Sequence, residues 1–276
     1  MTKTIKPFVG WAGGKSQLLP EIETEIKRAG QFDTYYEPFV GGGAVLFDLL
    51  PQKAVINDYN EELVNAYRTI RDDLPNLLTE LSKLHNSKDD FYKIRAWDRE
   101  PDYANLSKAK KAARFIYLIK TCFNSLYRVN RKGYFNTPYG RKRTIQIVDQ
   151  DNLTAISQYL NDNEVAITSG DFAKVLAQVK PNSLVYLDPP YVPLTTTASF
   201  TSYTAVGFNK SDQECLAQSC QHLDRIGAKF IASNSDTELV HELYQQFNIR
   251  TVYAKRNINA NGKKRGAVAE VLITNF

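Results

Sequence analysis

The sequence predicts an α/β protein with a doubly wound, mostly parallel sheet that a mostly helical segment interrupts. Near both ends of the chain, short apolar runs alternate with helical patterns, as they do in βαβ units. From Glu61 to about Tyr127, apolar residues recur at helical spacing and no convincing strand is seen. With 276 residues, of which 43% are hydrophobic and 24% charged, the chain is large enough to bury a sizeable core. We predict a core formed by residues 1–60 and 161–276, with residues 61–160 inserted into it.

The first βαβ unit is predicted between residues 34 and 58. An aromatic strand, Thr34–Phe39, leads into three consecutive glycines, Gly41 to Gly43, and then into a helix through Leu50. A second strand, Lys53–Asn57, ends at Asp58. Because the two strands are joined through a helix, they are expected to run parallel.

The glycine turn predicts a nucleoside site. Glycines between a strand and a helix let a ligand approach the backbone closely, but the dinucleotide fingerprint would need a further glycine where Leu46 stands. The turn therefore fits an uncharged nucleoside better than a pyrophosphate, and Asp58 is placed to accept hydrogen bonds from ribose hydroxyls. A purely structural glycine turn is the alternative.

The inserted segment is basic. Eleven lysines and arginines and no acidic residue lie between Asn105 and Val148, although the net charge of the whole chain is only +5. Within it, Gly133–Arg143 mixes turn formers with aromatic and basic residues and predicts a loop or small hairpin. Positive charge concentrated in this way is typical of a surface that binds a polyanion.

Strands and helices alternate again after about Glu164. A strand at Val165–Thr168 leads into Gly170-Asp171-Phe172, and the continuous apolar run Ser183–Leu187 predicts a buried parallel strand. The remaining predicted elements are a helix at Ser211–Leu223 with Ser211 as its N-cap, a strand at Lys229–Ala232, a helix at Thr237–Phe247 and strands at Arg250–Ala254 and Val268–Ile273.

The tetrapeptide Asp188-Pro189-Pro190-Tyr191 follows the buried strand Ser183–Leu187, at the end where ligands bind in open α/β sheets. The two prolines stiffen the turn and remove two amide donors, which leaves the Asp188 carboxylate and the proline carbonyls as acceptors. Such a site suits an –NH2 group, and Tyr191 offers a flat face on which a base can stack. An Asp-Pro turn that merely ends a strand is the alternative.

Several other site classes are not supported. The three cysteines are too few for a disulfide framework, and no histidine is paired with a plausible nucleophile. No cysteine or histidine spacing suits zinc, so we expect no metal. Trp11-Ala12-Gly13-Gly14-Lys15 lacks the spacing of a P-loop. The chain has no apolar run of membrane-spanning length and no apolar signal sequence, so we expect a cytoplasmic protein.

Taken in order, these motifs resemble the Dam-type DNA adenine-N6 methyltransferases, of the group in which the recognition domain lies between the binding and catalytic motifs. The resemblance covers nearly the whole chain. It is carried by Trp11 to Lys15, Glu37 to Gly43, Asn57-Asp58, Asn124, Arg128, Phe135-Asn136, Pro138 to Arg141 and Asp188 to Phe208.

The resemblance implies a fold and a reaction. The fold is a Rossmann-like methyltransferase sheet of seven strands with a C-terminal antiparallel hairpin, and the inserted helical domain recognises the DNA target. The reaction moves a methyl group from S-adenosylmethionine to the exocyclic N6 of adenine in double-stranded DNA, after base flipping and by direct in-line transfer. The expected target is GATC, and no metal is implied.

The resemblance also assigns residues. The catalytic group is Asp188, Pro189, Pro190 and Tyr191, and the cofactor contacts are Trp11, Lys15, Glu37, Phe39, Gly41, Gly43, Asp58, Asp171, Phe172 and Asp188. The DNA contacts are Phe123, Asn124, Leu126, Arg128, Pro138, Arg141, Lys142 and Tyr203, and the loop Thr195–Phe208 closes over the flipped base. The family often has Gly where this chain has Ser125 and Tyr where it has Phe123, so a relaxed specificity stays open.

Alternatives remain at this point. An RNA adenine or DNA cytosine amino methyltransferase would use the same chemistry, although cytosine enzymes more often have Ser where Asp188 stands. A non-catalytic DNA-binding relative is disfavoured because Asp188, Tyr191 and Asp58 are all present. We expect a monomer that acts on double-stranded DNA, and a paired restriction endonuclease is possible.

Overall fold

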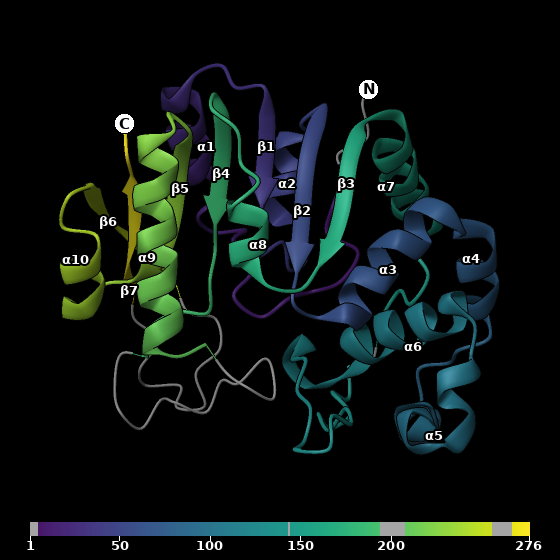
Figure 1. Cartoon of the computed structure of the whole chain (residues 1–276). Helices are drawn as coiled ribbons and strands as arrows, with labels where there is room; N and C mark the ends of the chain where they lie inside the picture. The colour runs from purple at the N-terminus through teal and green to yellow at the C-terminus, as the bar shows by residue number, and fades with distance from the viewer. Residues whose placement is uncertain (1–4, 143, 194–207, 256–266) are drawn as a thin grey trace.

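The computed structural model describes residues 5–142, 144–193, 208–255 and 267–276. Its centre is a seven-stranded sheet in the order β3-β2-β1-β4-β5-β7-β6. β1 to β5 are parallel, whereas β7 runs antiparallel to both β5 and β6. The doubly wound sheet and its C-terminal antiparallel hairpin, predicted above, are therefore confirmed (Figure 1).

Each predicted strand is present, with small differences at the ends. The strands are β1 (Thr34–Glu37), β2 (Lys53–Asp58), β3 (Glu164–Ser169), β4 (Ser183–Leu187), β5 (Lys229–Ser235), β6 (Asn248–Lys255) and β7 (Ala267–Thr274). β1 ends earlier than predicted because Pro38 has no N–H with which to continue the ladder. β5 runs three residues further, to Ser235, so its carboxyl end is polar.

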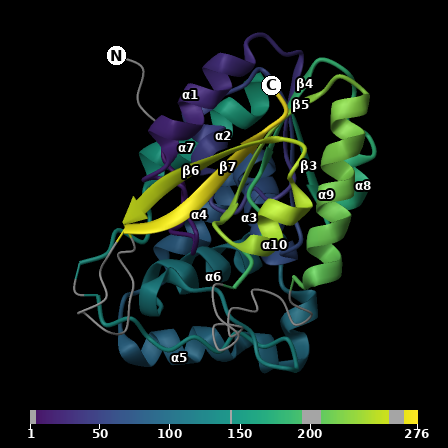
Figure 2. The same ribbon diagram turned by 90° about the vertical axis from the view of Figure 1, so that its left-hand side faces the viewer.

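Alternate residues of the central strands enter two separate cores. Tyr35 and Tyr186 belong to one hydrophobic cluster, and their neighbours Tyr36 and Val185 belong to the other. Burial on both faces explains why the parallel strands read as continuous apolar runs instead of alternating ones. Helices cover both faces, and Figure 2 shows α8 and α9 on one side of the sheet and α1, α2 and α7 on the other.

The helices around the core are α1 (Leu19–Ala29), α2 (Ala44–Leu49), α7 (Gln150–Asp162), α8 (Phe172–Leu176), α9 (Lys210–Arg225) and α10 (Glu238–Leu243). The predicted N-cap of α9 was wrong. Asn209, not Ser211, accepts hydrogen bonds from the N–H groups of Ser211 and Asp212, and Asp212 completes the capping box. The α10 helix is shorter than predicted, because the chain after Tyr244 turns to bring Phe247 against Phe230 before β6 begins.

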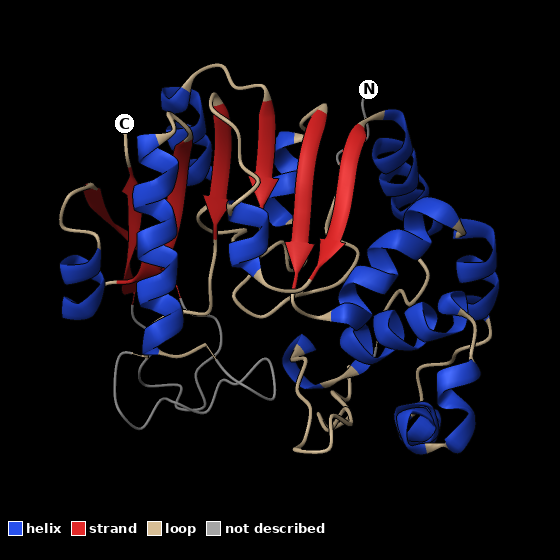
Figure 3. Ribbon diagram, viewed as in Figure 1, coloured by secondary structure: helices blue, strands red, loops and turns tan. Residues whose placement is uncertain are grey.

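The inserted segment is helical, as predicted. It contains α3 (Glu61–Asp72), α4 (Leu74–Ser82), α5 (Lys88–Ala96) and α6 (Lys108–Thr121), with short 3-10 turns η1 (Trp97–Arg99), η2 (Pro101–Asn105) and η3 (Phe123–Ser125). These helices lie beyond the carboxyl ends of β2 and β3, where the strand arrowheads point in Figure 3. Their apolar residues are continuous with one core of the sheet. No helix in the described part of the chain is long and apolar enough to cross a membrane.

Candidate active site

The tetrapeptide after β4 lies where the sequence placed it, at the carboxyl edge of the sheet. The Asp188 Oδ1 atom accepts a hydrogen bond from Ser233 Oγ at 3.0 Å and pairs with Lys15 Nζ at 2.7 Å. Burial raises the pKa of Asp188, whereas Lys15 and Ser233 act in the opposite direction. Both partners use Oδ1, and no bond to Oδ2 is recorded among the described residues. Among the described residues, Oδ2 has no partner and is open to a bond from a ligand.

A buried amide relay holds the backbone of this turn. Gln213 Nε2 donates to the Pro190 carbonyl at 2.9 Å, and Asn234 Nδ2 donates to Gln213 Oε1 at 3.1 Å. Asn234 Oδ1 accepts from the Val192 N–H at 3.1 Å, so the relay contacts the chain on both sides of Tyr191. The Pro190 carbonyl is therefore already occupied. Within the described residues, the Pro189 carbonyl has no recorded partner and is the second acceptor left for a ligand.

Tyr191 is held at its hydroxyl and over one face of its ring. Its hydroxyl donates to Glu270 Oε2 at 2.9 Å, and Lys15 Nζ lies 4.7 Å from the ring centroid. Burial, with the nearby charges of Asp188 and Glu270, raises the pKa of the phenol well above its usual value. The Tyr191 hydroxyl is therefore a neutral hydrogen-bond donor, and its bond to Glu270 on β7 orients the ring.

Lys15 belongs to a segment that packs across the site. Its ammonium group donates a hydrogen bond to the Gly13 carbonyl at 2.7 Å. Lys15 is 7% exposed, so its ion pair with Asp188 is buried. Trp11 of the same segment lies on the glycine turn, since a Cβ added at Gly41 would come within 2.7 Å of the indole. The indole also stacks on Tyr127 with ring centroids 6.0 Å apart.

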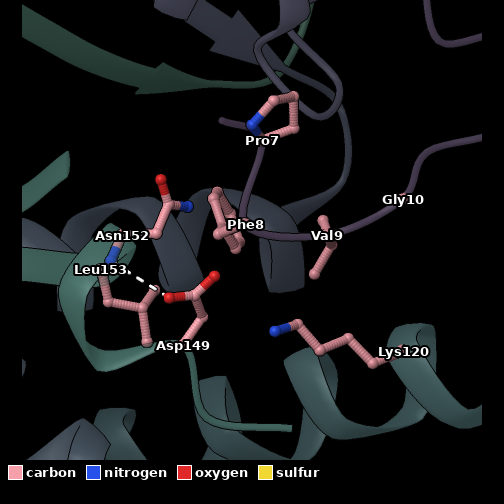
Figure 4. A pocket seen from close by; sticks show the side chains of 8 residues that line it. All are labelled: Pro7, Phe8, Val9, Gly10, Lys120, Asp149, Asn152 and Leu153. Atoms are coloured by element: carbon pink, nitrogen blue, oxygen red, sulfur yellow. Dashed lines mark hydrogen bonds between the residues drawn. The ribbon is translucent and has the colours of Figure 1, made fainter. Parts of the chain in front are cut away.

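The start of this segment is anchored to α7. Asn152 exchanges two hydrogen bonds with the Lys6 backbone, at 3.0 and 2.8 Å. The next residues, Pro7 to Gly10, line a cavity of about 150 Å³ whose other wall comes from Lys120 and the start of α7 (Figure 4). No residue of the catalytic turn lines this cavity, so we assign it to the anchoring of the segment.

The glycine turn requires its glycines. Gly41 and Gly43 have φ angles of 51° and 77°, in the left-handed region. A Cβ at Gly43 would lie 2.6 Å from the Tyr67 hydroxyl, which itself donates to the Gly41 carbonyl at 3.0 Å. Asn57 ties this turn to the end of β3, because its amide donates to both Pro38 O and Gly170 O at 3.0 Å.

Two carboxyl groups near the turn have raised pKa values. Burial raises the pKa of Asp58 to about 6, although the N–H groups of Asn60 and Gly41 bond to its oxygens at 2.9 and 3.0 Å. Burial raises the pKa of Glu37 to about 8, with the Asp188 charge acting in the same direction and the Tyr35 hydroxyl bond opposing it. Glu37 lies under the turn and is 2% exposed. Burial therefore favours its neutral form, and its role as a cofactor contact stays a prediction.

Three aromatic rings gather beside Asp58 and the end of β3. Phe39, Phe172 and Phe208 have centroids 5.2 to 6.0 Å apart. Asp171 caps α8 by accepting the Ala173 N–H at 2.9 Å, which places Phe172 as the first residue of that helix. Residues predicted from separate motifs thus meet in one apolar cluster.

The predicted DNA-contacting segment is exposed and has an unusual backbone. Phe123 is 52% exposed, although it is a large apolar residue. Asn124, Ser125 and Arg141 have φ angles of 54°, 51° and 54°, in a region that L-residues rarely adopt. At Ser125 the positive φ carries a strain that a glycine would not have.

The basic side chains of this segment differ in how many of their hydrogen-bond donors already have partners. Arg128 Nε donates to Asn136 Oδ1 at 2.7 Å and its Nη2 to Asn136 O at 3.2 Å, so part of the guanidinium is occupied. Lys142 donates to Lys120 O and Ser125 Oγ. Arg141 is exposed and has no recorded partner among the described residues.

Smaller contacts complete the segment. The Pro138 carbonyl accepts the Phe123 N–H at 2.9 Å, and the Leu126 carbonyl accepts the Thr137 hydroxyl at 2.7 Å. The loop predicted at 133–143 forms isolated bridges, Cys122 with Tyr139 and Val129 with Phe135, instead of a regular hairpin. The predicted contact Tyr203 lies outside the described residues.

Four residues of the site were not predicted from the sequence. Gln213, Ser233 and Asn234 hold the catalytic turn, and Glu270 holds Tyr191. The polar run Ser233–Ser235, directly after the apolar residues of β5, carried a usable signal, since polar residues at the carboxyl end of a buried strand often face a ligand. Gln213 and Glu270 had no such signal, because helix and strand contacts decide where they point.

Comparison with known proteins agrees with this geometry. The family model of the D12 class N6 adenine-specific DNA methyltransferases matches residues 11–258. The chain is 44% identical over 275 residues to the Type II methyltransferase M1.LlaDCHI of Lactococcus lactis subsp. cremoris, covering 99% of this chain and 96% of that protein. It is also 44% identical to the Type II methyltransferase M.MjaIII of Methanocaldococcus jannaschii, covering 99% of each, and 32% identical to a DNA adenine methylase of Serratia marcescens, covering 98% of each.

The fold and the acceptor-lined turn define an α/β methyltransferase. The family match then makes the class specific, and the chain belongs to the D12 class N6 adenine-specific DNA methyltransferases. It is an adenine-specific DNA methyltransferase whose substrate is DNA. Of the alternatives left open by the sequence, RNA and cytosine substrates are thereby disfavoured.

Proposed function

We propose that this enzyme transfers the methyl group of S-adenosylmethionine to N6 of an adenine that has been flipped out of double-stranded DNA, within the sequence GATC. The observation that carries the proposal is the free Oδ2 of Asp188 at the carboxyl end of β4, next to the glycine turn at the end of β1. Neighbouring parallel strands bring the predicted donor and acceptor sites to one edge of the sheet.

The residues present fit S-adenosylmethionine. Phe39 and Phe172 offer an apolar stacking face for its adenine, and the buried carboxyl of Asp58 lies beside the glycine turn that a ribose approaches. The positive φ of Gly41 and Gly43 leaves that turn without side chains. We place Trp11 and Lys15 over the methionine end of the same site. The cofactor supplies a methyl group on a positively charged sulfur.

The chain's own part in the reaction is to hold and polarise the amine. The N6 lone pair of adenine is delocalised into the ring, so the amine is a weak nucleophile. Acceptors at Asp188 Oδ2 and the Pro189 carbonyl bond to its two hydrogens and direct the lone pair outward. The new C–N bond forms as the methyl–sulfur bond breaks, with that electron pair going to sulfur. The amine then loses one proton, to Asp188 or to water.

The inserted segment supports duplex DNA and base flipping. Phe123 presents an exposed apolar ring of the kind that unstacks bases. Arg141 is exposed and has no partner among the described residues, so it can make a bidentate contact to guanine. Arg128 can contact the DNA beside Arg141 through the guanidinium nitrogen atoms that do not bond to Asn136. We assign Asn124, Leu126, Pro138 and Lys142 to the same surface.

The remaining expectations are part of this proposal. We infer that residues 61–160 form the recognition domain and that residues 1–60 with 161–276 form the catalytic core. α3 and α7 join the two, because both pack against β3. We further propose a cytoplasmic monomer that needs no metal. The names of two Type II methyltransferase relatives support pairing with a restriction endonuclease.

The test is transfer of a labelled methyl group from S-adenosylmethionine to short duplexes. One duplex contains a single GATC, a second contains GTTC at the same place, and a third contains N6-methyladenine in both strands of GATC. We expect incorporation into the first duplex alone. Equal incorporation into the first and second would reject GATC specificity, and no incorporation into any unmethylated duplex would reject the activity.

A further inference from the structure

We infer that Glu270 of β7 is a positioning residue that fixes the ring of Tyr191 in the orientation on which the flipped adenine stacks. The inference rests on the proposed function and goes beyond it, because neither the sequence motifs nor the family assigns this residue a role. The contact that carries it is the hydrogen bond from the Tyr191 hydroxyl to Glu270 Oε2 at 2.9 Å.

The two residues come from different parts of the sheet. Tyr191 follows β4, and Glu270 lies on β7, with β5 between them. Glu270 is paired in register with Ser235 on β5 and with Val252 on β6, so its backbone is fixed from both sides. A side chain on a central strand is a rigid support for a ring that belongs to a loop.

The amide relay leaves the Tyr191 side chain without such support. Gln213 and Asn234 fix the chain before and after Tyr191, but neither contacts its ring. The ring turns about two side-chain torsions, and a bond at its far end restricts both of them. Lys15, at 4.7 Å from the ring centroid, contacts the face, and Glu270 contacts the hydroxyl.

The carboxylate also has a chemical effect. A phenol that donates to a carboxylate forms a charge-assisted bond, which is stronger than a neutral one. Such a donor carries more electron density in its ring, and that density strengthens the attraction of the ring for the Lys15 cation. Glu270 therefore acts on the substrate through Tyr191, without touching it.

The experiment uses four variants of the full chain: Glu270→Ala, Glu270→Gln, Tyr191→Phe and the double variant Tyr191→Phe with Glu270→Ala. Methyl transfer is measured on the GATC duplex, and base stacking is measured by the fluorescence of 2-aminopurine at the target adenine. We expect Glu270→Ala to lower kcat about tenfold, the cost of one charge-assisted bond, with KM for S-adenosylmethionine unchanged. Glu270→Gln keeps an acceptor and should restore most of the rate.

The double variant separates positioning from general stabilisation. The Tyr191 hydroxyl also interacts with Ser233, so Tyr191→Phe removes more than the Glu270 bond. If that bond is the cause, the double variant loses no more than Tyr191→Phe alone, because Glu270→Ala then has no hydroxyl bond left to remove. Losses that multiply, or a Glu270→Ala variant with normal kcat and normal 2-aminopurine fluorescence, would overturn the inference. Glu164→Ala is the matched control, since Glu164 is an exposed strand glutamate paired with Lys53 at the opposite end of the sheet.

A failure of the proposed function is recognised separately. Denaturant unfolding of the wild type, Tyr191→Phe, Glu270→Ala and the double variant gives the coupling between Tyr191 and Glu270 without any substrate. If the wild-type protein transfers no methyl group but this coupling is present and the fluorescence still depends on Glu270, the function fails and the positioning role stands. If the wild-type protein is active and the coupling is absent, the positioning role alone fails.

Discussion

The predicted catalytic edge and the predicted DNA-contacting segment of this molecule are built in opposite ways. At the predicted catalytic edge, Asp188, the Pro190 carbonyl and Tyr191 are held by partners on β5, α9 and β7. In the segment from Phe123 to Lys142, apolar and basic side chains are exposed and three non-glycine residues have positive φ angles. Chemistry on one amine needs acceptors held in place before the substrate arrives, whereas binding along a duplex needs side chains that reach outward.

The largest expected effect lies at the catalytic edge. Asp188→Ala removes the free acceptor oxygen, and we expect a loss in kcat of at least about a thousandfold, in line with the removal of a principal charge-stabilising group. Single-turnover methyl transfer measures it. The companion variant Asp188→Asn keeps an oxygen for Lys15 and should fold with a Tm close to that of the wild type. Near-normal turnover in either variant would refute the role of the carboxylate.

The buried acid under the glycine turn gives the next effect, on stability. The pKa of Glu37 is about 8 when folded against a usual 4.5, so its neutral form stabilises the fold at low pH, and that contribution is lost as the pH rises from about 4.5 to 8. Glu37→Gln stays neutral and keeps an acceptor for Tyr35. Between pH 5 and pH 8, we expect the free energy of unfolding of the variant to rise relative to that of the wild type by on the order of a few kcal/mol.

Denaturant unfolding at several pH values measures this gain. Asp58 also has a raised pKa, but it is present in both proteins, so its contribution cancels in the difference. A stability difference that does not change with pH would show that Glu37 is charged in the folded protein.

Arg141 tests the exposed segment. Arg141→Ala should weaken binding to the GATC duplex by about 1–3 kcal/mol while binding to a scrambled duplex changes little, if the side chain contacts a base. Arginine and alanine have a similar backbone cost at the φ of 54° found at position 141, so a difference in folding does not explain the weaker binding. Titration at two salt concentrations is the measurement. Equal weakening for both duplexes, with a shallower salt dependence, would instead assign Arg141 to a phosphate.

The smallest effect concerns the strained backbone. Ser125→Gly relieves the positive φ of 51° and should raise stability by about 0.5–1 kcal/mol, with only an exposed bond from Lys142 lost. Asn182→Gly is the control, because Asn182 has a φ of 56° in a turn at the other end of the sheet. If Ser125→Gly also changes the ratio of GATC to scrambled methylation and the control does not, the backbone at Ser125 contributes to specificity.

Much of the fold was predictable because its signals are local. Continuous apolar runs gave β4 and β2, and Gly41 with Gly43 marked the turn between β1 and α2. Helix ends were less predictable, because the N-cap of α9 depends on which side chain bonds to the first N–H groups. α1 and α7 were not predicted, although both carry a local signal. Ile22, Ile26 and Ala29 in α1 recur at helical spacing, as do Leu153, Ile156 and Leu160 in α7.

The sequence by itself determined the order of the motifs, the acceptor character of the turn at Asp188 and the concentration of positive charge between residues 105 and 148. These are properties of residue types and short spacings, so they do not depend on distant contacts. Tertiary structure decided the rest: that Lys15 and Ser233 use the same oxygen of Asp188, that Gln213 occupies the Pro190 carbonyl, and that Glu270 holds Tyr191. Those partners are far apart in the chain, and only the strand order of the sheet brings them within hydrogen-bonding distance.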